Sequence, residues 1–437
     1  MAEPRLSRNP LSITGAVITT IAALAFLLFV LLGAFDLLAS PYAGLIGFVL
    51  IPGIFLVGLA LIPLGMWREG RRRRLGQPAW AWPAINLGDP TTRRIAMAIG
   101  VLTLVNLTIV AIASVGVVHY TESDQFCGAV CHRAMMPEAV AHLVSPHSQV
   151  ECVSCHVSPG AKGLISAKLN GTRQLYLYMS GTYHRPIPEP LGRIPGAADT
   201  CVHCHTAGHP NDDVTRTRLT YADDETSTES ASTITMHLGA IHWHARPDVV
   251  VEYVAADEKR ETIPYVRVTD AQGKQTEYLA EGVTSRPAGE LHRMDCLDCH
   301  NRPAHTFGVS ADHAVDTLIA SGAVSRDVPF LKKALVAAVS ADYASQADAD
   351  AGIAKHLRDA WKSADPKVAP EIERAVTAAR ELYRQNVFPD MKITWGTYMS
   401  QLGHIDAPGC FRCHDESHKS QSGAVIKQDC EQCHKMQ

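Results

Sequence analysis

Cysteine and histidine recur in this sequence in one fixed arrangement. The 12 cysteines form six pairs, and a histidine directly follows the second cysteine of every pair. The six groups are Cys127, Cys131 and His132; Cys152, Cys155 and His156; Cys201, Cys204 and His205; Cys296, Cys299 and His300; Cys410, Cys413 and His414; Cys430, Cys433 and His434. Five pairs have the spacing C-x-x-C-H, and the first pair has one additional residue. This pattern indicates attachment of c-type haem.

Haem attachment accounts for both residue types. Two thiols on a short turn can form thioethers with the two vinyl groups of one porphyrin, and the adjacent histidine then faces the iron as its proximal ligand. Structural zinc or disulfides would use the cysteines but would leave the six histidines without a role. The sequence therefore predicts six c-type haems. The widened first motif leaves two alternatives, attachment through two thioethers or through one.

Each iron has a second axial position, and 15 of the 21 histidines lie outside the motifs. The best candidate ligands lie near a motif in the sequence or, for His242 and His244, two residues apart on one side of an extended segment. They are His147, His242, His244, His305, His404 and His418. For the first haem Met135 is a candidate, since a thioether ligand raises the haem potential. The remaining histidines, His142 among them, fit exposed or hydrogen-bonded positions at least as well.

Three apolar segments precede the first motif. Residues Leu11–Phe35, Leu37–Trp67 and Ile95–Val118 contain no charged side chain. Each is long enough to cross a hydrocarbon core of about 30 Å as a helix. A cleaved signal peptide is the alternative for the first segment, but its apolar part is too long and a second segment follows almost at once. We therefore expect three transmembrane helices.

Charge predicts the orientation of these helices. Arg5 and Arg8 precede the first, and seven arginines lie between the second and third, whereas the link around Ser40 and Pro41 has no basic residue. Because cytoplasmic loops retain positive charge, we expect a cytoplasmic N-terminus and a periplasmic domain after Tyr120, in a bacterial inner membrane. Residues 1–120 hold nine basic and four acidic side chains, and the rest hold 31 and 40, so the formal charge of −4 combines +5 with −9. This gives no reason to expect a nucleic-acid partner.

The segments around the motifs predict a multihaem cytochrome c whose haem domain is mainly α-helical or irregular, with a small β meander. We expect strands at Val249–Val254, Glu261–Val268 and Gln275–Leu279. We expect helices at Ser310–Ala320, Asp327–Ala344, Asp350–Ser363 and Ala369–Asn386, and a polar loop at Tyr221–Thr233. A proline-rich stretch from Arg185 predicts a boundary. The expected domains are residues 1–120 (membrane), 121–184 (haems 1 and 2) and 185–437 (haems 3 to 6).

The region from Val101 to Tyr183 resembles the NapC/NirT family of membrane-anchored multihaem quinol dehydrogenases. The resemblance is carried by an anchor helix followed by Cys131-His132, Met135, Ser145-Pro146-His147 and Cys152-Val-Ser-Cys155-His156. The segments Ile241–His244, Met294–His305 and Gly409–His414 resemble larger members linked to electron export in metal-respiring bacteria. The resemblance implies oxidation of menaquinol beside the first haem and delivery of electrons to periplasmic cytochromes or a terminal reductase.

The chain departs from this family in its three spans, its six motifs and its quinol pocket. Quinol releases two protons, while each haem takes one electron, so a proton acceptor must lie beside the quinol. The resemblance implies that Lys168 is the pocket lysine, but Gln174 stands in a region where the family has a carboxylate. Glu122, Asp124 or Glu138 could replace that carboxylate, and His119 is a candidate by its position at the end of the third span.

The sequence thus predicts a quinol:cytochrome c oxidoreductase that contacts the lipid bilayer, the membrane quinol pool and a periplasmic acceptor. The alternative is an electron-relay subunit that receives electrons from a separate quinol-oxidising partner, which would dock on the first two helices.

The first prediction is the cofactor count. We expect six haems per polypeptide and no stoichiometric zinc, measured by haem extraction assay and by metal analysis of the purified chain. A haem ratio far below six together with bound zinc would contradict the haem assignment.

Overall fold

The computed structural model describes residues 9–34, 46–75, 88–189, 194–205 and 212–436, and the chain divides into two compact units, Met1–His132 and Arg133–Gln437. The first unit contains the long helices α1 (Pro10–Ala34), α3 (Ile51–Arg74) and α4 (Pro90–Glu122). Each of them is long and apolar enough to cross a membrane, which agrees with the three predicted spans. Arg5, Arg8 and the link at Ser40 and Pro41 lie outside the described residues.

Small residues bring α1 and α3 close together. A Cβ added to Gly58 would lie 2.7 Å from the Thr19 hydroxyl, and one added to Gly65 would lie 2.5 Å from the Ser12 hydroxyl. The same Ser12 hydroxyl donates a hydrogen bond to the carbonyl of Ile62 at 2.8 Å. Close packing through glycine and serine is typical of helix pairs in membranes, where apolar surface gives little drive for association.

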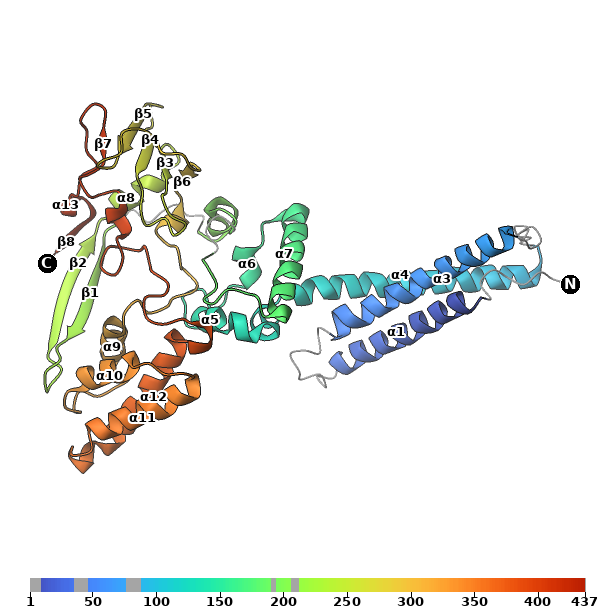
Figure 1. Ribbon diagram of the computed structural model, residues 1–437, viewed down its shortest axis with the longest axis horizontal. Coiled ribbons are helices and arrows are strands. Elements are labelled where there is room, and N and C mark those ends of the chain that lie inside the picture. Colours follow the sequence, from blue (N-terminus) through green and yellow to red (C-terminus); the bar gives the residue numbers. More distant parts are fainter. Residues whose placement is uncertain (1–8, 35–45, 76–87, 190–193, 206–211, 437) are drawn as a thin grey trace. The chain divides into compact units, whose positions relative to one another are not determined.

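Four helices in the second unit form a module without any haem motif (Figure 1). They are α9 (Ala311–Ala320), α10 (Leu331–Ser340), α11 (Gln346–Ala360) and α12 (Ala369–Asn386). They bury a common core that includes Val315, Leu335, Ile353 and Val376. The predicted helices are therefore present. The third begins four residues earlier than expected, because the Ser345 side chain caps it by accepting from the Asp348 amide.

The predicted meander is the centre of a five-stranded antiparallel sheet with the order β6-β3-β4-β5-β7. Its strands are β3 (Val250–Val254), β4 (Tyr265–Thr269), β5 (Gln275–Leu279), β6 (His292–Arg293) and β7 (Lys419–Ser420). The two short edge strands come from segments next to the fourth and fifth haem motifs. The sheet thus connects parts of the chain that are far apart in the sequence.

The polar loop predicted at Tyr221–Thr233 is confirmed only for residues 222–228, which form the turn of a β-hairpin, whereas residues 229–233 belong to its second strand. Strand β1 (Val214–Tyr221) pairs with β2 (Glu229–Met236), which pairs in turn with the C-terminal strand β8 (His434–Met436). The many threonines were misleading, since their hydroxyls suggest a loop whereas their β-branched side chains favour strands. Thr215 and Thr217 face Thr235 and Thr233 across the hairpin, with 3.0 Å between the hydroxyls in each pair.

A buried ion pair joins α9 to α10, and its two residues hydrogen-bond the hairpin. The ammonium group of Lys332 lies 2.8 Å from the carboxylate of Asp316 and 3.2 Å from that of Asp312. The Asp316 carboxylate also accepts the backbone amide of Tyr221 at the end of β1, and the Lys332 amide donates to the Ser227 hydroxyl in the turn. Because Asp316 and Lys332 are almost fully buried, each charge depends on the other for compensation.

This pair gives a stability prediction. The substitution Lys332→Met keeps the side-chain length but leaves Asp316 buried without a cation, so we expect a loss of about 3–5 kcal/mol in the free energy of unfolding. Lys355→Met is the matched control, because its pair with Asp359 is exposed and should contribute less than about 1 kcal/mol. Denaturant unfolding followed by circular dichroism measures both. Equally small losses of unfolding free energy in both variants would contradict the role of the Lys332–Asp316 pair.

Candidate functional site

Each of the six cysteine motifs forms a short helical turn. Such a turn places the two cysteines on one side of the backbone, since residues three apart are neighbours on a helix. The turns are η2 (Phe126–Val130), α6 (Cys152–His156), η4 (Cys201–His203), η6 (Cys296–Asp298), η9 (Gly409–Arg412) and α13 (Cys430–Cys433). The widened first motif differs from the others, because its turn is π-helical and therefore accommodates the additional residue.

Each of the twelve cysteine side chains is at least partly exposed. Within the described ranges of the chain, no three histidine, cysteine or carboxylate side chains are grouped so that they could hold a metal ion. A zinc ribbon needs four such ligands around one ion. The arrangement of the cysteines in pairs on short turns is the one that thioether attachment of a porphyrin requires.

Histidines from distant parts of the chain lie opposite the motif histidines. Metal–imidazole bonds are about 2.0 Å long, so two imidazoles on opposite sides of one ion have ring centroids about 6 Å apart. Four motif histidines have a partner ring at 5.9–6.2 Å. The pairs are His156 with His305, His205 with His147, His414 with His244, and His434 with His404. All four partners were candidate ligands on sequence grounds, but the sequence did not indicate the pairing.

The fifth motif histidine of this unit, His300, lies near another candidate ligand. Burial lowers its pKa, and the next cause is the charge of His242, followed by that of His205. The motif histidines His205 and His300 therefore lie near the segment that contains His242 and His244. This segment is a helical turn, η5 (His242–Ala245), instead of the extended stretch that the sequence suggested.

The orientation of several paired rings is fixed through Nδ1. The Nδ1–H groups of His147, His244, His305 and His414 donate to backbone carbonyls, at distances of 2.8–3.1 Å. A carbonyl oxygen can only accept, so Nδ1 carries the proton and Nε2 keeps its lone pair in the neutral ring. Burial also lowers the pKa of His305 to about 4, which keeps that ring neutral. This is the arrangement that metal-binding histidines adopt in proteins.

Other candidate ligands are placed differently. The buried His418 has both ring nitrogens hydrogen-bonded, Nδ1 to the Asp415 carboxylate at 2.9 Å and Nε2 to the Ile263 carbonyl at 2.7 Å. Met135 is half-buried on helix α5 (His132–Leu143), which begins at the first motif histidine. The side chain of His132 lies outside the described part of the structure.

His142, which the sequence did not favour as a ligand, is also buried in this region. Its ring centroid lies 6.1 Å from that of His305.

The attachment turns of motifs two to six follow one another in space. For Cys155, Cys296, Cys299 and Cys433, burial is the largest cause of a raised thiol pKa, and a cysteine of a different motif is the next. These neighbours connect the second motif to the third, the third to the fourth, the fourth to the fifth, and the fifth to the sixth. The order in space therefore matches the order in the sequence.

Hydrogen bonds join the fourth and fifth turns to each other and connect the fourth to the segment just before the third. The Asp295 carboxylate accepts the amide of Ala197, next to the third motif, at 3.1 Å, and the Asp298 carboxylate accepts the Asp295 amide at 2.8 Å. Within the fifth motif, the guanidinium of Arg412 donates to the Asp298 carbonyl at 2.6 Å. We refer to Asp295, Asp298 and Arg412 as the polar chain. It fixes the third, fourth and fifth attachment turns relative to one another.

The sheet supports the polar chain from the side. Tyr253 on β3 donates its hydroxyl to the Asp298 carboxylate, and Arg260 donates to the same oxygen at 3.3 Å. Arg412 also donates to the carbonyls of Gly409 and Arg260, at 2.9 Å in both cases. Asp298, Arg412 and Tyr253 are all buried, so the network is shielded from water. Two of its members, Asp298 and Arg412, are charged residues that lie between paired cysteines, a signal that sequence reasoning missed.

A second network surrounds the His305 ring. Arg302 lies 3.1 Å from the Glu138 carboxylate and 3.5 Å from that of Glu189, and its guanidinium stacks 4.1 Å from the ring centre of Tyr398. The Glu138 carboxylate is 3.2 Å from Nδ1 of His305. Burial raises the pKa of Glu138, although the charge of Arg302 opposes this shift. Glu138 is therefore part of the surroundings of a candidate iron ligand.

The other quinol-pocket candidates lie on two helices. Lys168 is half-buried and Gln174 is exposed, and both belong to α7 (Gly160–Ser180). His119 lies in the last turn of α4, in the first unit.

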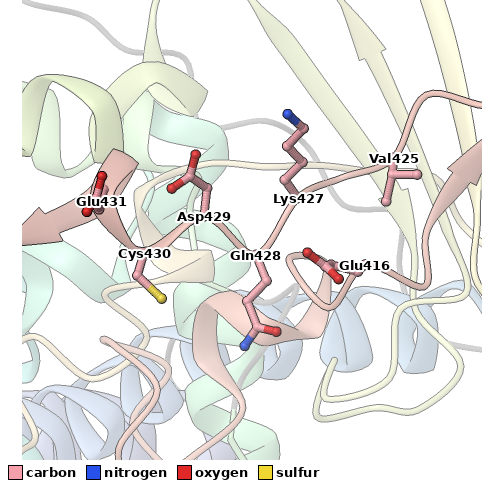
Figure 2. Close-up of a pocket in the computed structure, with 7 residues that line it drawn as sticks. All are labelled: Glu416, Val425, Lys427, Gln428, Asp429, Cys430 and Glu431. Atoms are coloured by element: carbon pink, nitrogen blue, oxygen red, sulfur yellow. The ribbon is translucent and has the colours of Figure 1, made fainter.

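The sixth motif borders a surface depression of about 600 Å³ (Figure 2). Its lining residues include Cys430 together with the carboxylates of Glu416, Asp429 and Glu431, and one lysine, Lys427. The thiol of this last motif is thus accessible, in a mostly acidic setting.

Known c-type cytochromes are similar to this chain in sequence. Residues 90–187 match the model of the NapC/NirT cytochrome c family, N-terminal region. The chain is similar to the cytochrome c-type protein ImcH of Geobacter sulfurreducens, with 35% identity over 98% of this chain and 88% of that protein. No solved structure matches the chain.

Proposed function

Because the chain belongs to the NapC/NirT family of c-type cytochromes, we propose that it oxidises menaquinol at the periplasmic face of a bacterial inner membrane and passes the electrons to periplasmic cytochromes or a reductase. The observation that carries this proposal is a succession of neighbouring attachment turns in which four motif histidines each have a second histidine ring at 5.9–6.2 Å, namely His156, His205, His414 and His434. Such a succession serves electron transfer over a distance.

The residues that would hold six haems are the twelve cysteines and the six motif histidines. In the second unit, His305, His147, His242, His244 and His404 would complete the coordination opposite His156, His205, His300, His414 and His434. Met135 is the proposed second ligand for the first motif. We assign His418 a structural role, because both of its nitrogens bind protein oxygens. When bound, each haem supplies a one-electron carrier.

The protein's own residues must take up the protons of the quinol. Lys168 and Gln174 are the proposed quinol-binding residues of the second unit, and His119 is a separate candidate in the first unit. All three side chains can hydrogen-bond a quinol hydroxyl, and Lys168 and His119 can also exchange a proton. The buried contacts of Glu138 with Arg302 and His305 support a role in holding the His305 ring instead. A fixed Nδ1–H donor defines which ring nitrogen faces a metal and in which direction.

The proposed acceptor approaches from the periplasm through a basic face. The part of the chain after residue 120 has a formal charge of −9, and carboxylates border the sixth motif. Complementary charge raises the rate of encounter between redox partners. In the alternative function, an electron relay, the same exit would be used, but a separate membrane protein would oxidise the quinol.

The function is tested with the purified full chain and a reduced menaquinol analogue. We expect haem reduction without any partner, and we expect Lys168→Met to slow it by about 10²-fold or more, the usual contribution of a positioned proton-transfer group. Lys162→Met, on the same helix, is the matched control. Reduction by dithionite must stay normal in both variants. No reduction of the wild-type chain by quinol would favour the relay.

The ligand assignment is tested at the sixth motif. The substitution His404→Met should raise the potential of one haem, on the order of 0.1 V, within the range of about 0.8 V over which axial ligands act. It should also add the near-infrared signature of methionine ligation. His313→Gln is the control, because His313 forms an ion pair with Asp406 and is not a proposed ligand. A redox titration in which no haem of the His404→Met variant has a raised reduction potential would contradict the assignment of His404 as a ligand.

A further inference from the structure

Helix α7 (Gly160–Ser180) carries an exposed apolar stripe. Ile165, Leu169, Tyr176 and Met179 have 60%, 69%, 70% and 78% of their surface exposed. Their spacings of four, seven and three residues place them on one face of a helix. Four large apolar side chains in line, all more than half exposed, form an unusual surface for a water-soluble helix. We refer to these four residues as the α7 stripe.

The rest of the helix shows that the stripe is not a loose part of the core. Tyr178 and Tyr183, at the end of α7 and just beyond it, pack against the cluster of Ala141, Phe388 and Tyr398. Leu164 and Leu175 are half-buried. The helix therefore already has a packed side, and the stripe is additional apolar surface pointing away from it.

The charged residues of α7 are all basic. Lys162, Lys168 and Arg173 are the charged side chains between Gly160 and Ser180, and this segment contains no carboxylate. At about 100° per residue they lie roughly 60–80° from the centre of the stripe, with Lys168 on one side and Lys162 and Arg173 on the other. Basic residues therefore flank the apolar face along both edges.

This pattern is that of a helix lying in the interface of a lipid bilayer. The apolar face enters the boundary between headgroups and acyl chains, and flanking lysine and arginine side chains extend to the phosphates. Anionic lipid attracts such basic groups. The three candidate spans would also hold the helix at a membrane, so that even weak contacts become effective through high local concentration.

We propose that the α7 stripe docks in the headgroup region of the bilayer and holds the second unit against the membrane surface. The inference rests on the proposed function in one respect, namely that the quinol site is served by this helix. Docking would place Lys168, on the edge of the stripe, at the depth of lipid phosphates and quinol headgroups. The bilayer would then be part of the path by which quinol reaches the pocket.

The test uses the full chain, reconstituted in nanodiscs that contain phosphatidylglycerol. The photoreactive residue p-benzoylphenylalanine replaces Tyr176 in the stripe or, as the control, Asn170, which is exposed on a different side of α7. We expect lipid adducts at position 176 at least about fivefold more abundant than at position 170, because an interfacial helix presents one face to lipid. Equal labelling, or labelling of protein or haem in place of lipid, would overturn the proposal.

A functional readout complements the labelling. The pair Leu169→Glu and Met179→Glu puts charge into the stripe, and Asn170→Glu is the matched control. We expect the stripe variant alone to lose most of its haem reduction by a membrane-dissolved quinol analogue, with haem content and reduction by dithionite unchanged. An unchanged rate would overturn the docking proposal. A wild-type chain without haem would contradict the proposed function, whereas the lipid labelling at position 176 would still test the docking of the α7 stripe.

Discussion

The hydrogen bond from Arg412 to the Asp298 carbonyl links the fourth and fifth attachment turns, and the surrounding fold depends on it. A short turn has too few residues to bury a core of its own, so its position must come from its neighbours. The polar chain supplies this, and its two buried members, Asp298 and Arg412, both have hydrogen-bond partners, the condition under which buried charge is tolerated. The sheet contributes Tyr253 and so holds the network in place.

The attachment residues could be proposed from the sequence because their chemistry is local. A cysteine pair and its histidine are contiguous, and so are the apolar spans and the capped helices beginning after Ser310. The pairing of His156 with His305 depends instead on folding across about 150 residues, and no local pattern encodes that contact. The β1–β2 hairpin was missed for another reason, since threonine has a polar hydroxyl but a strand-forming backbone preference.

The helical module without a haem motif is stabilised differently from the regions around the motifs. Its four helices bury leucine, valine and isoleucine in a conventional core, whereas the regions around the motifs contain mostly short turns and polar networks. A haem contributes a large apolar surface when it is attached, so polypeptide around a haem needs less core of its own. The β1–β2 hairpin, tied to the module through Lys332 and Asp316, connects the two kinds of structure.

The acceptors of the four Nδ1 hydrogen bonds are backbone carbonyls, and this has a consequence for how the protein can evolve. The carbonyl of Lys427 or Glu138 keeps its direction whatever side chain stands at that position, provided the local backbone is kept. Imidazole orientation is thereby uncoupled from side-chain identity. Relatives can diverge widely in sequence around these sites while the geometry of each ring is inherited intact.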